Sequence, residues 1–304
     1  MFSQVVTLKH LRYFDALTRY AHFGRAAAAC GISQPAMSMQ VKDLEEILGT
    51  ALVERGGRHA RLTPFGEEIA VRVRSILRTI DEIGQLARLS GDQIAGRLRV
   101  GMIPTVAPYL LPRVIEMLAR EHPHIEVRVR EAVTSKLIEE LAESRIDTAI
   151  VALPVSEPSL TEISLFTENF LLVRPAGDEG KPIPSVGMLD DMRLLLLEEG
   201  HCFRNQALSF CGLQSSSRRE ALDASSLSTL VQMVRAGIGV TLIPEMAVAV
   251  EAGSGSVSVA RFEDPQPSRT IGMIWRKTSP LAAQLLPLSN FLRRQLDPAR
   301  KQDA

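Results

Sequence analysis

Residues 26–44, AAAACGISQPAMSMQVKDL, decide the fold of the first third of the chain. The run of alanines predicts a short helix that permits close packing, and Gly31 suits the tight turn after it. Ser33 is a favourable N-cap, and Pro35 lies in a first turn, where its missing N–H costs little. The segment therefore predicts a short helix, a glycine turn and a second helix that begins near residue 34.

This second helix has an apolar and a polar side. Its apolar positions recur at helical spacing, at Met37, Val41, Leu44 and Leu48. Its polar positions are Gln34, Ser38, Lys42 and Glu45. A recognition helix presents such a polar strip to the major groove, although any amphipathic surface helix also has a polar side. An expected helix over residues 8–20 precedes this pair. Arg55, Arg58 and Arg61 surround a Gly-Gly pair after it, so the arrangement resembles a winged helix-turn-helix.

A long helix follows this basic segment. Thr63 is its expected cap, and Pro64 its first residue. The apolar positions step by 4 and 3 in alternation, at Ile69, Val73, Ile76, Ile80, Ile83 and Ala87. This heptad pattern favours pairing with a second copy of the helix, and the alternative is a single helix that packs on its own core. Small polar residues over 90–96 predict a domain boundary.

The remainder of the chain has the pattern of an α/β protein. Short apolar runs near 98–104, 125–129 and 148–153 alternate with helical stretches, which predicts parallel strands with covering helices. A second such series begins near residue 170, and two units imply a cleft between them. Open parallel sheets bind ligands at the carboxyl ends of their strands, so Thr105 and Thr134 are expected to face one site.

The cysteines fall into two settings. Cys30 lies in the alanine-rich helix, where we expect a small buried thiol. Cys202 and Cys211 are nine residues apart, which on a helix is about 900° of rotation and about 13 Å of rise, too far for a disulfide. A bond between them would therefore require that helix to unwind. The spacing leaves three interpretations open: two packed thiols, a redox pair, or a metal site with His201.

The charge distribution and the cysteine content indicate which class of protein this is. The 304 residues carry no net charge, but residues 1–90 have 12 basic against 9 acidic side chains and the rest have 23 against 26. The basic excess thus coincides with the expected DNA-binding segment. Three cysteines in so long a chain exclude a disulfide scaffold and indicate a reducing compartment. No signal peptide or transmembrane stretch is recognisable, so we expect a cytoplasmic protein without cofactors.

The quoted motifs resemble those of a known family. Ser33-Gln34-Pro35-Ala36-Met37-Ser38, with Leu44-Glu45 and Leu52-Val53-Glu54-Arg55, is similar to the DNA-binding domain of LysR-type bacterial regulators. The resemblance implies a dimer or homotetramer that binds double-stranded operator DNA, contacts RNA polymerase and is not an enzyme. It also implies a periplasmic-binding-protein-like effector domain of two subdomains. The expected DNA-binding residues are Ser33, Gln34, Pro35, Ser38, Lys42, Arg55 and Arg58.

The domain boundaries follow from these patterns. We expect a winged helix-turn-helix domain over 1–63, a dimerising linker helix over 64–91 and an effector domain over 92–304. Within the effector domain, subdomain I is expected over about 92–166 and 269–304, and subdomain II over about 167–268.

The segment from Gly200 to Cys211 is similar to the redox segment of the hydrogen-peroxide-sensing OxyR branch of that family. This resemblance implies that Cys202 is the peroxidatic thiol and Cys211 its disulfide partner. It further implies a peroxide pocket formed by Thr105, Thr134, His201 and Arg269. Oxidation that stops at the sulfenic acid remains open. The alternative is a regulator that responds to a small organic effector, with structural cysteines.

Overall fold

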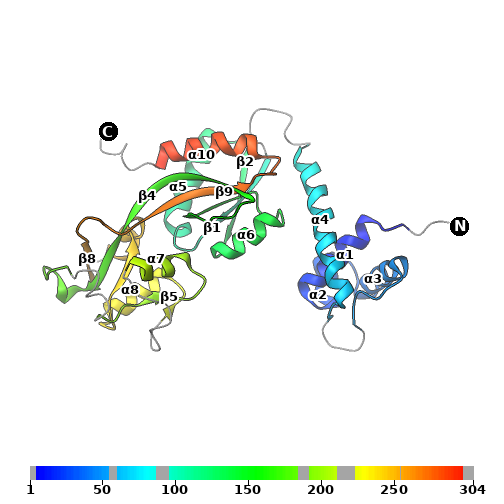
Figure 1. Ribbon diagram of the computed structural model, residues 1–304, viewed down its shortest axis with the longest axis horizontal. Coiled ribbons are helices and arrows are strands. Elements are labelled where there is room, and N and C mark those ends of the chain that lie inside the picture. The colour runs from blue at the N-terminus through cyan, green and yellow to red at the C-terminus, as the bar shows by residue number, and fades with distance from the viewer. Residues whose placement is uncertain are drawn as a thin grey trace. The chain divides into compact units, whose positions relative to one another are not determined.

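The computed structural model describes residues 5–54, 60–86, 96–183, 192–210, 223–253 and 255–296. The chain divides into two compact units, Met1–Ala87 and Arg88–Ala304. The first unit is helical, whereas the second combines a twisted sheet with helices, and each is taken by itself below (Figure 1).

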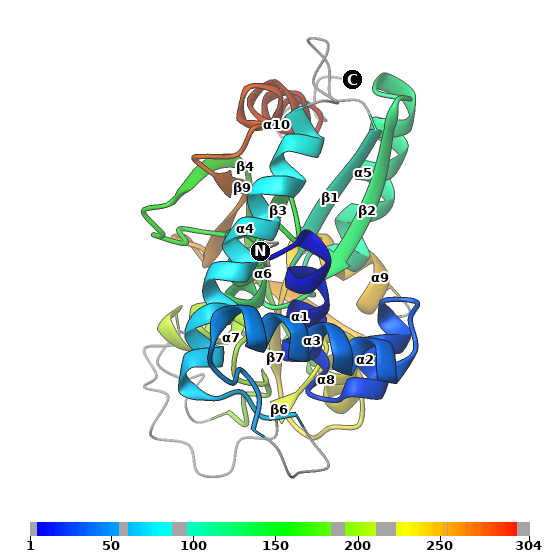
Figure 2. The same ribbon diagram turned by 90° about the vertical axis from the view of Figure 1, so that its right-hand side faces the viewer.

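The helices of the first unit pack around one apolar core. They are α1 (Leu8–Tyr20), α2 (Phe23–Ala29), α3 (Gln34–Leu48) and α4 (Pro64–Leu86), and they are short except for α4 (Figure 2). The predicted short helix, turn and second helix are confirmed. Met37, Val41 and Leu44 are buried in the core together with Phe14 of α1.

Local hydrogen bonds determine where α2 and α3 begin. The His22 side chain caps α2, because its Nδ1 accepts from the Gly24 N–H at 3.1 Å. Ser33 caps α3 by accepting from the Ala36 N–H at 3.4 Å. Between the two helices Gly31 adopts a φ of +68°, a left-handed conformation that side chains with a Cβ rarely adopt. The sequence signals for the turn thus have the expected physical basis.

A short antiparallel pairing follows α3. Val53 pairs with Leu62, and the Glu54 N–H donates to the Arg61 carbonyl at 2.9 Å. Residues 55–59 between them, which include the predicted DNA contacts Arg55 and Arg58, lie outside the described residues. We call the paired residues 52–54 and 60–62 the base of the wing.

The N-terminus of α4 is fixed to this base. The Thr63 hydroxyl caps α4 by accepting from the Gly66 N–H at 2.9 Å, and it donates to the Ala51 carbonyl at 2.8 Å. Gly66 lies so close to the wing that a Cβ there would be 2.1 Å from the Leu52 carbonyl oxygen. Only a glycine therefore fits between α4 and the wing.

The heptad positions of α4 divide into two groups. Val73 is buried in the core of its own unit and Ile69 packs against that core, whereas Ile76 and Ile83 are 46% and 61% exposed. The interpretation of the whole pattern as one pairing surface is therefore wrong for its first part. Packing on the same chain accounts for these first apolar residues, and the exposed isoleucines remain available to a partner.

The second unit is built on a mixed sheet of strand order β2-β1-β3-β9-β4-β7, with β8 paired to β4. Its strands are β1 (Gly96–Met102), β2 (Ile125–Glu131), β3 (Thr148–Leu153), β4 (Leu160–Pro175), β7 (Thr241–Pro244), β8 (Val257–Arg261) and β9 (Ser268–Arg276). A separate parallel pair is formed by β5 (Leu196–Leu197) and β6 (Asp223–Ala224). The helical elements are α5 (Ala107–Glu121), α6 (Thr134–Ala142), η1 (Ala176–Asp178), α7 (Cys202–Phe210), α8 (Leu227–Arg235), η3 (Glu245–Ala247), α9 (Val248–Glu251) and α10 (Ala282–Leu296).

The pairing of these strands differs from expectation in one respect. β1 pairs in parallel with β2 and β3, as predicted, but β9 runs antiparallel to both β3 and β4. β4 is 16 residues long, and the strand expected from residue 170 is only its second part. The first part was missed because polar side chains such as Glu162 and Glu168 interrupt its apolar pattern.

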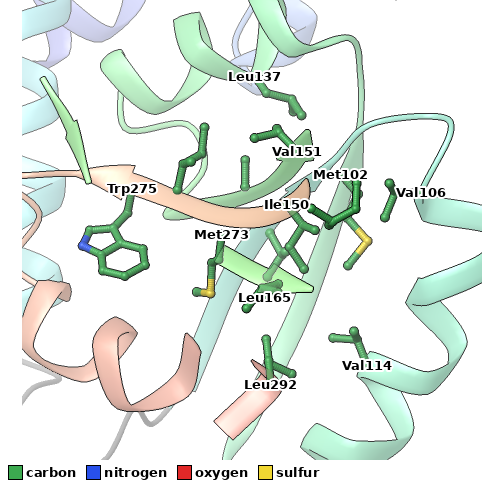
Figure 3. Packing of buried hydrophobic residues seen from close by; sticks show 14 of the residues in the cluster. Met102, Val106, Val114, Leu137, Ile150, Val151, Leu165, Met273, Trp275 and Leu292 are labelled. Atoms are coloured by element: carbon green, nitrogen blue, oxygen red, sulfur yellow. The ribbon is translucent and has the colours of Figure 1, made fainter. Parts of the chain in front are cut away.

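Two apolar cores lie along these long strands. The first contains residues of β1, β3, α5, α10 and β9, among them Met102, Val114, Ile150, Met273 and Trp275 (Figure 3). The second contains residues of β7, α7 and α8 and the end of β4, among them Phe170, Leu172 and Phe203. β4 thus runs from one core to the other, and β9 pairs with it over its first part. In the described part of the chain, no helix is long and apolar enough to cross a membrane.

Candidate functional site

The start of α3 presents a polar surface in the first unit. Five of the predicted DNA-binding residues lie there, and each is exposed: Ser33, Gln34, Pro35, Ser38 and Lys42. The Ser33 side chain also caps the helix. Lys42 forms an ion pair with Glu46 at 3.3 Å, where the two side chains are 61% and 53% exposed. An exposed pair of this kind is weak, so the Lys42 ammonium group is free to exchange its partner for a phosphate.

Glu45, expected in the same polar strip, has a different position. Its carboxylate accepts hydrogen bonds from the Leu52 and Val53 N–H groups at 2.7 and 3.0 Å. Glu45 therefore orients the wing relative to α3 and does not belong to the exposed polar strip. The helical spacing alone could not predict that backbone N–H groups at the base of the wing donate to this carboxylate.

In the second unit, Cys202 is the first residue of α7 and is a partly buried free thiol. Its side chain packs against the first apolar core, whereas the next residue, Phe203, belongs to the second core. Cys202 therefore lies where the two cores meet. Its predicted partner Cys211 is outside the described residues, so the proposed pairing stays a prediction.

Beside α7 lies a buried polar network on β9. Arg269 Nη1 donates to the Thr105 hydroxyl at 2.8 Å, and Nη2 donates to the Thr105 carbonyl at 3.0 Å. The guanidinium carbon of Arg269 lies 5.4 Å from the centre of the Phe203 ring, next in sequence to Cys202. The structure thus joins Thr105 and Arg269 directly, although they are 164 residues apart.

Thr134 and Gln206 each carry a buried polar atom that finds no hydrogen-bond partner among the described residues. The Thr134 hydroxyl lies at the start of α6, and Gln206 is one turn after Cys202 on α7. Buried polar atoms without partners are uncommon and often mark a place for a ligand or water. Thr134 was predicted from the sequence. Gln206 was missed, although its spacing of four from Cys202 places both on one helix face.

His201 and Arg204 flank the cysteine. Partial burial lowers the pKa of His201, while the nearby Glu198 carboxylate acts in the opposite direction. The Arg204 guanidinium, two residues after the cysteine, donates to the Leu197 carbonyl at 2.7 Å and pairs with Asp223 at 2.6 Å. The Arg204 charge is thereby compensated by Asp223, and its role is to hold α7 against β5 and β6.

Cys30 differs from the prediction of a buried thiol. It is half-buried at the C-cap of α2. Partial burial and the Asp15 carboxylate raise the pKa of the Cys30 thiol. The described residues also contain no cluster of histidine, cysteine and acidic side chains able to hold a metal, and Cys211 of the proposed metal site is not among them.

A cavity of about 310 Å³ lies next to this network. Its lining is Tyr109, Leu110, Arg113, Phe166, Thr167, Glu168, Glu245, Met246 and Leu296. None of the predicted peroxide-pocket residues belongs to this lining. Glu168 connects the two places, because its carboxylate lines the cavity and also bonds Arg269 at 2.8 Å. Glu168 was missed from the sequence, where it is one of several polar residues in the first part of β4 and carries no signal that distinguishes it from them.

The fold and exposed α3 surface define a DNA-binding protein with a separate α/β domain. Two family models match the chain: the bacterial regulatory helix-turn-helix protein of the lysR family over residues 8–67, and the LysR substrate binding domain over residues 91–297. The chain therefore belongs to the LysR family of bacterial regulators. It is a DNA-binding transcriptional regulator and not an enzyme.

Similar proteins within the family carry names that refer to hydrogen peroxide. A probable hydrogen peroxide-inducible genes activator of Streptomyces viridosporus is 42% identical over 94% of this chain and 93% of its own length. The DNA-binding transcriptional dual regulator OxyR of Escherichia coli is 36% identical over 96% of each chain. The resemblance to the OxyR branch is confirmed.

Solved structures agree with this assignment. A full-length OxyR variant of Pseudomonas aeruginosa has a TM-score of 0.72 and 36% identity, over 95% of this chain and 98% of that chain. A hydrogen-peroxide-bound OxyR variant of Corynebacterium glutamicum has a TM-score of 0.65 and 34% identity, over 95% of this chain and 92% of that chain.

Proposed function

We propose that this regulator senses hydrogen peroxide through Cys202 and thereby changes operator binding and the transcription of oxidative-stress genes. The observation that carries the proposal is the position of Cys202 where the two cores meet. It is next to Phe203, over which lies the Arg269 guanidinium that also binds Thr105. The names of similar proteins support the same function.

The chemistry requires a thiolate and a polarised peroxide. The Cys202 sulfur attacks one peroxide oxygen, the O–O bond breaks, and the leaving hydroxide takes up a proton to become water. The Thr134 hydroxyl, which lacks a partner in the described structure, and the donors of Arg269 and Thr105 are suited to hold the peroxide oxygens. His201, with its lowered pKa, is neutral at pH 7, and we assign its ring to the same pocket.

Disulfide formation is the second step. The Cys211 thiol attacks the Cys202 sulfenic acid, an S–S bond forms, the S–O bond breaks and water leaves. α7 is helical over Cys202–Phe210, and at helical spacing positions 202 and 211 are too far apart for a disulfide, so this step requires α7 to unwind. Refolding of 202–211 then repacks a contact between effector domains and alters the spacing of the DNA-binding domains.

The wider assembly follows the family pattern. We assign to the chain a cytoplasmic homotetramer that binds dyad-symmetric double-stranded DNA through α3 and the wing and acts on RNA polymerase. The effector unit is assigned a periplasmic-binding-protein-like architecture of two subdomains, one around each apolar core. The exposed Ile76 and Ile83 of α4 are suited to a partner helix.

The deciding experiment treats reduced protein with stoichiometric hydrogen peroxide and follows Cys202 by mass spectrometry. In parallel, operator footprints are compared for reduced and oxidised protein. The expected result is modification of Cys202 and a changed footprint. An unmodified Cys202, or an unchanged transcriptional response in Cys202→Ser, contradicts the proposal. A thermal shift by a metabolite that persists in Cys202→Ser would instead favour a small organic effector.

A further inference from the structure

Glu168 and Arg269 stand opposite each other on the two long strands of the second unit. They are direct partners in the antiparallel pairing of β4 with β9. Arg269 Nε donates to Glu168 Oε1 at 2.8 Å, and the side chains are 0% and 6% exposed. This ion pair lies in the interior, at the point where β4 passes from the first core toward the second.

The Glu168 carboxylate has a second donor. Its Oε2 accepts the Met246 N–H of η3 at 3.0 Å, so each oxygen of the carboxylate is engaged by a different element. Arg269 in turn uses its remaining nitrogens on the Thr105 hydroxyl and carbonyl. A continuous chain of buried hydrogen bonds therefore runs from η3 through Glu168 and Arg269 to the loop after β1.

This series of hydrogen bonds determines the position of the Arg269 guanidinium. An arginine side chain rotates about several single bonds, and a carboxylate at Nε fixes the plane of its fork. With that plane fixed, the remaining donors point to Thr105 and the face of the group lies over Phe203. We propose that Glu168 is a positioning residue of the peroxide site, which acts through Arg269 and does not touch peroxide itself. This inference rests on the function proposed above for Arg269 and Cys202.

A carboxylate is required at position 168 because two N–H groups point at it. A glutamine of the same shape has one oxygen and one NH2 group, so it can accept only one of the two hydrogen bonds and opposes the other donor. Glu168→Gln therefore releases either Arg269 or the Met246 N–H. In a buried site this loss is not replaced by bulk water, and the guanidinium becomes free to turn away from Thr105.

The ion pair of Glu168 and Arg269 also predicts that the reaction of Cys202 with peroxide depends on pH. Burial raises the pKa of Glu168, although the Arg269 charge and the Met246 N–H oppose this effect. The other groups that face it are Glu245 of η3, which raises its pKa further, and Tyr109 and Arg113 of α5, which line the same cavity. Tyr109 stays neutral, since burial and its bond to Glu251 raise its pKa. On acidification Glu168 is therefore protonated at a higher pH than an ordinary carboxyl group, and this releases Arg269.

The test compares two reactions of Cys202 in the full-length protein: oxidation by hydrogen peroxide and alkylation by iodoacetamide. Alkylation needs the thiolate but not the Arg269 donors, so the ratio of the two rates isolates the positioning effect. For Glu168→Gln we expect this ratio to fall by on the order of tenfold, since small misplacements of catalytic donors have effects of this size or larger. Glu168→Asp keeps the charge but shortens the reach, and is expected to lie between wild type and Glu168→Gln.

Asp147→Asn is the matched control. Asp147 is a buried carboxylate directly before β3 that accepts from the N–H of Arg99 of β1 at 2.7 Å and from the Arg99 guanidinium. The Asp147→Asn variant should leave the ratio of oxidation to alkylation unchanged. This control separates the positioning effect from the general loss of a buried ion pair. The ratio should also fall on acidification in wild type and do so less in Glu168→Gln, whereas His201 titrates in both proteins.

The outcomes are distinct. A ratio that is equal in wild type, Glu168→Gln and Asp147→Asn overturns the inference while the proposed function stands. An equal fall in Glu168→Gln and Asp147→Asn also overturns it, because the effect is then structural. If wild-type Cys202 is not oxidised at all, the proposed function fails first. Should Glu168→Gln not fold, the ratio in Glu168→Asp and its pH profile decide the question in the same way.

Discussion

Cys30 and Cys202 are both cysteines at the end of a helix. Cys30 lies at the carboxyl end of α2, whereas Cys202 lies at the amino end of α7. Cys30 is the C-cap of α2, where its N–H donates to the Ala26 and Ala27 carbonyls at 3.1 Å, and burial together with the Asp15 carboxylate raises the pKa of its thiol. Cys202 is the first residue of α7, beside the buried Arg269 network. Both are half-buried, so accessibility alone does not separate them.

The difference lies in the charges and dipoles around each sulfur. The carboxyl end of a helix and a neighbouring carboxylate both disfavour an anion, whereas the amino end of a helix stabilises one. An attacking thiol reacts as its thiolate. The two thiols are thus alike in partial burial and differ in the direction of the helix and in the nearest charge.

The largest expected effect is a difference in peroxide response between variants of the two cysteines. Cys202→Ser should abolish the peroxide response, because no other described thiol has the surroundings needed to react. Cys30→Ser should leave the response intact. The measurement is transcription from a target operator after a peroxide pulse in cells that carry each variant. A lost response in Cys30→Ser would break the comparison.

A second prediction concerns what holds α7 in place. Asp223→Asn removes the charge that compensates Arg204, whose side chain is 11% exposed and bound to the Leu197 carbonyl. We expect a loss of roughly 1–2 kcal/mol in the local stability of α7, which is about a tenfold faster amide exchange there. Exchange in α2 should not change.

Hydrogen exchange followed by mass spectrometry measures both helices in one experiment. Glu116→Gln serves as the control, since it removes only an exposed pair with Arg120 in which the side chains are 71% and 69% exposed. Faster exchange of α7 in that control as well would show that the Arg204 contact is not what anchors the helix.

A smaller effect is expected at Cys30. Asp15→Asn removes a negative charge that raises the Cys30 pKa, so the thiolate fraction at pH 7 increases and alkylation by iodoacetamide speeds up severalfold at most. Burial, the larger cause of the raised pKa, persists. Cys202 in the same molecule provides the internal reference. An unchanged Cys30 rate would mean that Asp15 does not act on the thiol.

The smallest effect is on the pH dependence of stability. The pKa of His201 is lowered below its ordinary value of 6.5 in the folded protein, so the unfolded chain binds this proton more readily. The free energy of unfolding should therefore fall as pH decreases from about 6.5 toward the lowered pKa. Urea unfolding of wild type and His201→Gln between these values tests this, since the variant should lose that part of the slope.

The helices of the DNA-binding unit were predictable because their signals are local. Ser33 and Thr63 cap α3 and α4 as their positions in the sequence indicate. The return of β9 along β4 was not predictable, because it pairs residues about 100 positions apart, such as Glu168 with Arg269. The same distance hid the role of Glu168. Arg269 was predicted only through the resemblance, whereas Thr105 was already expected from its place at the carboxyl end of a strand.

The close approach of Gly66 to Leu52 has a mechanical consequence. Thr63 and Gly66 bind the first turn of α4 to the base of the wing, and Glu45 binds that base to α3. The base of the wing, α3 and the start of α4 therefore turn as a single rigid body. α4 has 23 residues and is about 35 Å long. A small tilt at its far end is carried to the DNA-contacting surface at the same angle, without loss in a flexible joint.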